Sequence, residues 1–384
     1  MRNWVKVFFL LLAFSEDLLA SPISLDHGKP VSLLTRNFDS DKSVLVMLGE
    51  LAFKSETLLS PSRSFAIPLS CDSCHPDGGT TQILFVEGLS GKPGTIDITN
   101  RALTIYEDGT FNPVNVPSIF GARHTEPYSR AGNFASLREF TRFVIVEEFG
   151  GMEPTNLTLD ALVAYEDSLN FLTNNMILEN GSLQENVSIS AKRGELIFNR
   201  PFPGKSELTC AACHDPKRYF IDGKKHDVGT GLALDTPTLR DLSISAPYMH
   251  DGRFDTIKEV LNYFNEQYNL RLDNQDLDDL HSYLGVVGGG TTEIKKEATL
   301  LRLENVILLL TKTLEAKDWA LGKMVTDQAL VEINIERVGA GAERKQVLDF
   351  FASSLGEIDS FNKLENYERS LEILEEMKGR ITSP

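Results

Sequence analysis

The chain has 384 residues, which at about 100–200 residues per domain predicts two or three domains. Its composition, with 41% hydrophobic and 24% charged residues, is typical of a globular protein and excludes a disordered or fibrous one. The 38 Lys and Arg against 55 Asp and Glu give a formal net charge of −17, which disfavours nucleic acid and anionic membrane surfaces as partners. A basic partner protein would suit this charge better.

Residues 1–20 have the pattern of a secretory signal. Two basic residues precede an apolar run at residues 7–14, and residues 18–20 suit a cleavage site. Glu16 and Asp17 lie close to that site, so an uncleaved anchor is an alternative. No later segment has the length and apolarity of a membrane span. We therefore expect a protein exported to the periplasm.

All four cysteines lie in two C-x-x-C-H motifs, Cys71-Asp72-Ser73-Cys74-His75 and Cys210-Ala211-Ala212-Cys213-His214. Four cysteines are too few for a disulfide scaffold. Two thiols three positions apart on one turn can form thioethers with both vinyl groups of a porphyrin, and the following His can bind iron through Nε2. A thioredoxin-like site would not need the His, and a tetrahedral zinc site would need the two motifs to meet in space. The motifs predict two covalently bound haem c groups, with His75 and His214 as iron ligands.

The two motifs head two related halves of the chain. Residues 117–140 align without gaps on residues 237–260 at a constant offset of 120, with six identities: Pro117/Pro237, Pro127/Pro247, Tyr128/Tyr248, Gly132/Gly252, Phe134/Phe254 and Glu139/Glu259. Residues 159–165 match residues 277–283 at nearly the same offset. Each half therefore runs from a haem motif through a Pro-rich turn to two helices.

This organisation predicts a mainly α fold with two cytochrome c-like haem domains in tandem. The first domain would occupy residues 21–178 and the second residues 186–287, with the boundary near the polar stretch 174–188. A helical C-terminal region would follow at residues 291–384.

The C-terminal region begins after three glycines at residues 288–290, which predict a hinge. Residues 292–317, 340–355 and 360–378 have helical periodicity. We expect a small bundle that packs on the haem domains; a docking surface or the contact of a homodimer is the alternative. The region has neither Cys nor His, so it is not expected to bind a third haem or a metal.

Residues 61–287 resemble the bacterial di-haem cytochrome c peroxidase family, which includes the MauG-type enzymes. The strongest match is DTPTLRDLSISAPYMHDGRFDTIKEV at residues 235–260, downstream of CAACHDP. The resemblance implies that His75 binds the iron of a peroxide-reacting haem and His214 that of an electron-relay haem. It also implies that Arg240 contacts a haem propionate, a charge-assisted interaction.

The family resemblance further implies a calcium ion between the two domains. Its ligands would be the Asn115 side chain and the backbone carbonyls of Ser245 and Pro247, since a hard cation prefers oxygen. Asn115 could alternatively cap a turn.

Two positions depart from the family pattern. The distal ligand of the second haem would fall on Phe264, which cannot bind iron, so Tyr263, Met249 or no side chain at all are the alternatives. Arg130 stands where the family has a Trp between the haems, and the only Trp outside the signal is Trp319.

The distal side of the first haem needs a base that moves the peroxide proton. Counting along the family pattern leads to Gly150, and a short slip would give the role to Glu147 or Glu148. Arg142 and His124 are weaker candidates. Three further histidines lie in no motif and receive no role: His27, His226 and His281.

The leading hypothesis is an exported di-haem oxidoreductase that reduces hydrogen peroxide with electrons from a small redox protein, a cytochrome c or a cupredoxin. A MauG-like enzyme that oxidises a partner protein is a second hypothesis. A di-haem electron carrier without catalysis is a third, favoured by the missing Trp and the uncertain position of the distal Glu.

Overall fold

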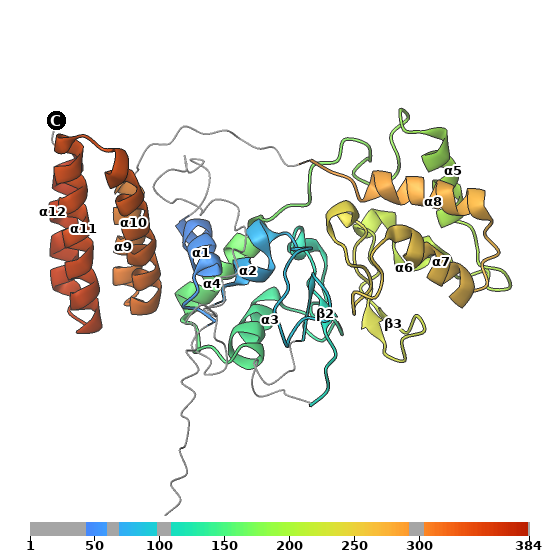
Figure 1. Cartoon of the computed structure of the whole chain (residues 1–384), viewed down its shortest axis with the longest axis horizontal. Helices are drawn as coiled ribbons and strands as arrows, with labels where there is room; N and C mark the ends of the chain where they lie inside the picture. Colours follow the sequence, from blue (N-terminus) through green and yellow to red (C-terminus); the bar gives the residue numbers. More distant parts are fainter. Residues whose placement is uncertain (1–43, 60–68, 98–108, 292–302, 383–384) are drawn as a thin grey trace, which may run out of the picture.

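The computed structural model describes residues 44–59, 69–97, 109–291 and 303–382, and the predicted signal lies outside them. The described chain is mainly α-helical, with two small antiparallel two-stranded sheets (Figure 1). The predicted mainly α class is therefore confirmed. None of the helices in these ranges is long and apolar enough to span a bilayer.

The first half carries its helices and strands in the order α1 (Val44–Lys54), α2 (Cys71–Cys74), β1 (Thr95–Ile96), β2 (Val114–Asn115), α3 (Leu137–Phe143) and α4 (Asn156–Ser168). Between them lie the 3₁₀ turns η1 (Pro76–Gly78) and η2 (Ala122–His124), and α3 continues into a π-helical turn, η3 (Val144–Glu148). α4 starts at a polar cap, because the Thr155 hydroxyl accepts a hydrogen bond from the Thr158 N–H.

The second half repeats this order with α5 (Ile189–Phe198), α6 (Cys210–Cys213), η4 (Pro216–Arg218), β3 (Lys225–His226), β4 (Leu234–Asp235), η5 (Leu242–Ile244), α7 (Ile257–Gln267) and α8 (Asn274–Val287). The sequence repeat corresponds to matching structure: Glu139 and Glu259 both lie in the first turn of a helix, and cis peptide bonds precede both Pro127 and Pro247. In α7 the Glu259 carboxylate accepts the Thr256 N–H, which completes a capping box.

In each half the helix before the cysteine motif crosses the last helix at a glycine. A Cβ atom on Gly49 of α1 would lie 1.9 Å from the Ala161 carbonyl oxygen of α4. A Cβ atom on Gly194 of α5 would lie 2.1 Å from the Asp279 carbonyl oxygen of α8. The two backbones thus touch directly in both halves, and only glycine fits at the crossing.

The C-terminal region consists of four helices, α9 (Leu303–Glu315), α10 (Trp319–Gly339), α11 (Ala342–Lys363) and α12 (Tyr367–Thr382). Figure 1 shows them beside α1 and α4, on the side of the first half that faces away from the second. Buried side chains of α9 to α12 form one continuous apolar core with those of α1 and α4. The periodicity predicts three helices here and misses α10.

A buried carboxylate fixes this bundle to the first half. Asp318, 2% exposed, caps α10 by accepting the Leu321 N–H at 3.0 Å. It also accepts hydrogen bonds from the hydroxyls of Thr155 and Thr158 at the start of α4. The bundle is therefore joined to the first half by polar as well as apolar contacts.

The glycines predicted as a hinge are packed. Gly288 ends α8, and a Cβ atom there would lie 2.3 Å from the Cβ of Leu242. A Cβ atom on Gly290 would lie 2.5 Å from the Cβ of Leu172. These two glycines allow neighbouring side chains to approach the backbone closely, and they do not form the free hinge that the sequence predicted.

We expect Gly49→Ala and Gly194→Ala each to lower the free energy of unfolding by about 1–3 kcal/mol, because the added methyl group overpacks the helix crossing. Gly285→Ala is the matched control: it lies in α8 with open space around it, and should stabilise the helix by about 0.5–1 kcal/mol. Denaturant unfolding of the three variants measures this, and equal effects of Gly194→Ala and Gly285→Ala would contradict the crossing.

Candidate haem sites

The first cysteine motif forms a single helical turn with a capping box. The Ser73 N–H donates to Ser70 Oγ at 3.2 Å, and the Ser70 N–H donates to Ser73 Oγ at 3.0 Å. Cys71 and Cys74 carry free thiols, and burial raises the pKa of Cys74 to about 12, so it is protonated. Both sulfur atoms therefore lie on one turn, and the Cys74 thiol is buried in its neutral form.

His75 closes this turn, since its N–H donates to the Cys71 carbonyl at 2.9 Å. The residue is partly exposed, and its Nδ1 is buried without a hydrogen bond. Burial lowers the pKa of His75, against the opposing effect of the Pro117 and Gly79 carbonyls. The ring is neutral at pH 7, which is the form that binds a metal.

The second motif has the same construction. Thr209 caps α6 by accepting the Ala212 N–H at 2.8 Å, and burial raises the pKa of Cys210 to about 12. His214 Nδ1 lies 3.1 Å from the Phe220 carbonyl oxygen, so Nδ1 carries the proton and donates it. Burial lowers the pKa of His214. The tautomer leaves a lone pair on Nε2, as an iron ligand requires.

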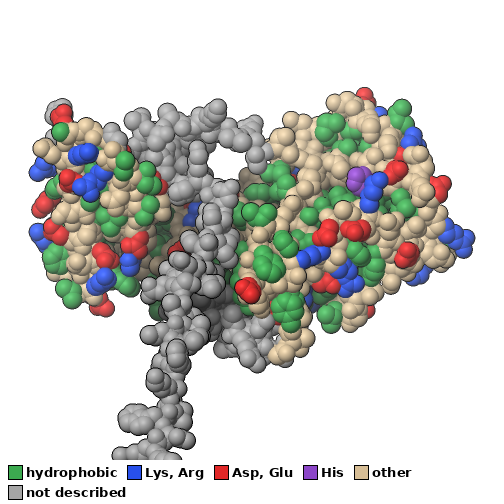
Figure 2. All heavy atoms as spheres, viewed as in Figure 1, with side chains coloured by type: hydrophobic (Ala, Val, Ile, Leu, Met, Phe, Trp, Pro, Cys, Tyr) green, Lys and Arg blue, Asp and Glu red, His purple; other side chains and the backbone are tan. Residues whose placement is uncertain are grey.

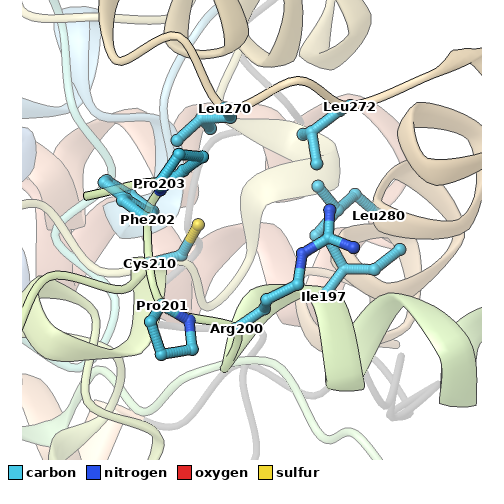
Figure 3. Close-up of a pocket in the computed structure, with 9 residues that line it drawn as sticks. All are labelled: Ile197, Arg200, Pro201, Phe202, Pro203, Cys210, Leu270, Leu272 and Leu280. Carbon is cyan, nitrogen blue, oxygen red and sulfur yellow. The ribbon is translucent and has the colours of Figure 1, made fainter. Parts of the chain in front are cut away.

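Beside Cys210 lies a small, open hollow lined mainly by apolar residues. In Figure 3 the sulfur of Cys210 points into the space enclosed by its lining residues, which are Ile197, Arg200, Pro201, Phe202, Pro203, Cys210, Leu270, Leu272 and Leu280. Such a lining suits one edge of a flat apolar macrocycle attached through this thiol. Arg200 stands at the rim, 2.9 Å from Asp276.

The residues therefore fit covalent haem better than zinc. In the described part of the chain no cluster of metal-binding side chains combines the two cysteine pairs. One cluster does contain a cysteine, with ligand atoms of Cys213, Asp222 and His226 within 4.8 Å of one another. A thioether at Cys213 would leave only the Asp222–His226 pair, which is already hydrogen-bonded at 2.7 Å.

The two candidate bases of the first half lie in the π-helical turn η3. Gly150, to which counting along the family pattern leads, is exposed and follows this turn. Glu148 is half-buried, and burial raises its pKa to about 7, while Arg130 acts in the opposite direction. Glu147 lies 3.9 Å from the guanidinium of Arg142, which donates two hydrogen bonds to Glu153. The Glu148 carboxyl group can therefore exchange a proton near neutral pH.

The predicted calcium ligand Asn115 lies at the junction of the halves, in β2. Its N–H donates to the His250 carbonyl at 3.0 Å, and its side-chain Oδ1 is buried without a hydrogen bond. Asp235, at the equivalent place in β4, donates its N–H to Arg130 O at 3.1 Å and also has a buried Oδ1 without a partner. Two oxygens with unused lone pairs suit a hard cation.

Asp235 was not among the predicted calcium ligands, although the sequence repeat points to it. Extending the alignment by two residues before Pro117 and Pro237 pairs Asn115 with Asp235 at the same offset. Burial raises the pKa of Asp235 to about 7. The other two predicted ligands offer backbone carbonyls, and the Ser245 hydroxyl donates to the Asp241 carbonyl at 2.8 Å.

The candidates for the second iron's distal ligand are partly engaged elsewhere. The Tyr263 hydroxyl donates to the Val228 carbonyl at 2.6 Å, a bond that iron binding would replace. Phe264 stacks on Tyr268 with 6.0 Å between ring centroids. Met249 adopts a positive φ of 68°, directly before His250.

A buried acid beside the first motif is a second residue that the sequence reasoning missed. Glu166 in α4 is 8% exposed, and its carboxylate accepts the Thr141 hydroxyl at 2.7 Å. Burial raises the pKa of Glu166 to about 8. Burial also raises the pKa of Cys71, and the charge of Glu166 acts in the same direction. The repeat gives no signal for it, because the equivalent residue of the second half is Leu284.

Comparison with known proteins gives one family. The sequence model of the di-haem cytochrome c peroxidase family matches residues 193–277. The methylamine utilization protein MauG of Methylophilus methylotrophus is 30% identical over 141 residues, which are 29% of this chain and 41% of that protein. The gamma subunit of hydrazine synthase from Kuenenia stuttgartiensis is 25% identical over 304 residues, 63% of this chain and 77% of the subunit. A cytochrome-c peroxidase, IdrP2, of a Pseudomonas strain is 43% identical over 56 residues, 15% of this chain and 14% of that protein.

We expect Glu166 to make stability depend on pH. Its pKa is about 8 in the folded chain against an ordinary 4.5, so the folded state holds the extra proton and the free energy of unfolding falls as pH rises between these values. Glu166→Gln should remove this contribution and flatten the dependence between about pH 5 and about pH 8.5. Denaturant unfolding at several pH values measures it, with the exposed Glu87→Gln as control. Equal slopes for the wild type and Glu166→Gln would refute the assignment.

Proposed function

Since the chain belongs to the di-haem cytochrome c peroxidase and MauG family, we propose that each half is a cytochrome c-type domain with one haem c and that the protein reduces hydrogen peroxide. The observation that carries the proposal is the repeated site: a pair of free thiols on one helical turn, followed by a buried neutral histidine. The glycine-mediated helix crossing, which recurs in both halves, supports two domains of one kind.

The haem groups, when bound, supply the redox chemistry, and the protein positions them. Cys71 and Cys74 would hold the first haem and Cys210 and Cys213 the second, through thioethers. His75 and His214 would bind the irons through Nε2. Arg240 would meet a haem propionate, because its buried Nε has no hydrogen bond and burial lowers the pKa of its guanidinium.

Glu148 is the residue we assign to proton transfer in the first half. The reaction takes up two electrons and two protons for each hydrogen peroxide and gives two water molecules. A carboxylate with a pKa of about 7 can accept the peroxide proton and return it to the leaving oxygen. The Glu147 side chain lies beside Arg142 and is the less suitable candidate.

A calcium ion at the junction would use the unpartnered Oδ1 of Asn115 and the carbonyls of Ser245 and Pro247. The Asp235 carboxylate offers a further oxygen at the equivalent place. Neutralising Asp235 in this way would remove the cost of burying its charge.

Electrons for the reaction would come from a small redox protein, a cytochrome c or a cupredoxin, and the net charge of −17 favours a basic one. On the face shown in Figure 2, acidic and basic side chains are interspersed. The attraction of a basic partner therefore comes from the net charge of the whole molecule rather than from one acidic patch on this face. Export follows from the signal pattern of residues 1–20.

Oxidation of a partner protein is the second candidate function. The match to MauG favours it, and so does Phe264, which departs from the distal iron ligand of the family pattern. In this case the haem groups would supply the oxidising chemistry when bound, hydrogen peroxide would be the oxidant, and the partner protein would be the source of the two electrons.

The first experiment measures the cofactors and their reaction with peroxide. We expect two covalent haems per chain by mass and by pyridine haemochrome, and one in either the Cys71→Ser/Cys74→Ser or the Cys210→Ser/Cys213→Ser variant. Stoichiometric peroxide should then change the haem spectrum within milliseconds. If peroxide does not change the spectrum, even after one-electron reduction of the protein, both enzymatic functions are rejected and the protein is an electron carrier without catalysis. Peroxide-dependent oxidation of a reduced small cytochrome or cupredoxin would separate the peroxidase from the enzyme that acts on a partner protein.

A second measurement tests Glu148. Glu148→Gln should slow the peroxide reaction by about 100-fold or more, because the proton acceptor is lost. In the wild type the rate should rise with pH through about 7, as the carboxylate forms, and this rise should vanish in the variant. Glu147→Gln is the matched comparison, and a larger effect there would transfer the role to Glu147.

A further inference from the structure

The segment after α4 is hydrogen-bonded to both halves. The Gly121 N–H of the first half donates to the Leu169 carbonyl at 2.6 Å. In the other direction, the Leu172 N–H donates to both carboxylate oxygens of Asp241 at 3.2 Å. Arg240 Nη2 donates to the Leu172 carbonyl at 3.3 Å. The backbone around Phe171 is therefore fixed between the two halves.

Three aromatic rings stack at this point. His124 comes from η2 of the first half, Phe171 from the connecting segment, and Tyr219 from the end of η4 in the second half. The ring centroids of His124 and Tyr219 are 4.2 Å apart and those of Phe171 and Tyr219 are 5.6 Å apart, at interplanar angles of 21° and 29°. Among ring contacts between described residues, this stack alone joins the two halves.

Phe171 touches a turn of each half. Gly121 has a φ of +69°, and a Cβ atom there would lie 2.3 Å from the Phe171 ring, so the ring rests on the glycine backbone. On the other side the Arg240 guanidinium carbon lies 5.1 Å from the ring centroid. A cation at this distance from an aromatic ring is attracted to it.

These two turns also serve the two candidate iron ligands. Gly121 lies four residues after Pro117, whose backbone carbonyl raises the pKa of the His75 imidazole. Arg240 lies three residues after Pro237, whose backbone carbonyl raises the pKa of the His214 imidazole. Phe171 thus lies between the turn that follows Pro117 and the turn that follows Pro237.

We infer that Phe171, with Tyr219 and His124 stacked on it, forms the path by which electrons cross between the two haems. The inference rests on the proposed function. Each crossing moves one electron from the haem of the second half to that of the first, and no bond or proton of the three rings changes. Two crossings deliver both electrons for one peroxide, and the redox partner replaces them. Arg130, which stands at the family's Trp position, is exposed and lies outside this stack.

The test measures electron transfer between the haems directly. The holoprotein is reduced by a short radiolytic pulse, and the redistribution of the electron is followed optically, after spectroelectrochemical titration has given both midpoint potentials. Phe171→Leu and Tyr219→Leu should each slow the redistribution by about tenfold or more, equivalent to at least about 1.4 kcal/mol of activation free energy, with unchanged potentials. Tyr219→Phe keeps the ring and should retain the wild-type rate.

Phe350→Leu is the matched control, since it removes a ring from α11 in the C-terminal bundle, and its rate should equal the wild type. If Phe171→Leu does not fold, Tyr219→Leu decides, because Tyr219 is 38% exposed. Unchanged rates in the Leu variants would overturn the path, and so would equal slowing by Tyr219→Phe and Tyr219→Leu. A wild type that binds no haem or ignores peroxide would instead overturn the proposed function.

Discussion

The direct contact between two helix backbones in each half is the constraint on which the rest of the structure depends. Gly49 and Gly194 bring the helix before each cysteine motif onto the last helix of the same half. In both halves the cysteine turn follows the first helix of this pair along the chain. Burial lowers the pKa of His75 and His214, which close the two turns, and keeps both imidazoles neutral. The crossing thus holds together the first and the last helix of the half that contains each histidine.

The two halves meet through reciprocal contacts. The N–H of Asn115 donates to His250, and the N–H of Asp235 donates to Arg130; the donors and the acceptors are both related by the 120-residue repeat. A junction of this kind behaves like the contact of a two-fold dimer, in which each bond has a partner of the same type. The side chains of both donor residues also carry a buried Oδ1 without a hydrogen bond.

Much of this organisation could be predicted from the sequence, because it depends on local spacing. The cysteine turns, the repeat and the helices α3, α4, α7 and α8 all carry short-range signals. Counting along the family pattern leads to Gly150 and does not distinguish Glu147 from Glu148, because their different surroundings arise only in the folded chain. Glu166 has no equivalent in the other half, and its burial results from packing against α3. Phe171 lies outside both aligned repeats, so nothing near it in the sequence predicts its ring contacts.

The core shared by α1, α4 and the C-terminal bundle has a consequence for how the chain is made. The second half has its own core, built from side chains between residues 177 and 287. The core of the first half includes side chains as far along as Met377, so the second half is an insertion between two parts of one folding unit. During synthesis the inserted half can close as soon as its last helix is complete, whereas the core shared by α1, α4 and the bundle is complete only with nearly the whole chain. The first helix to be made, α1, therefore belongs to the core that is finished last.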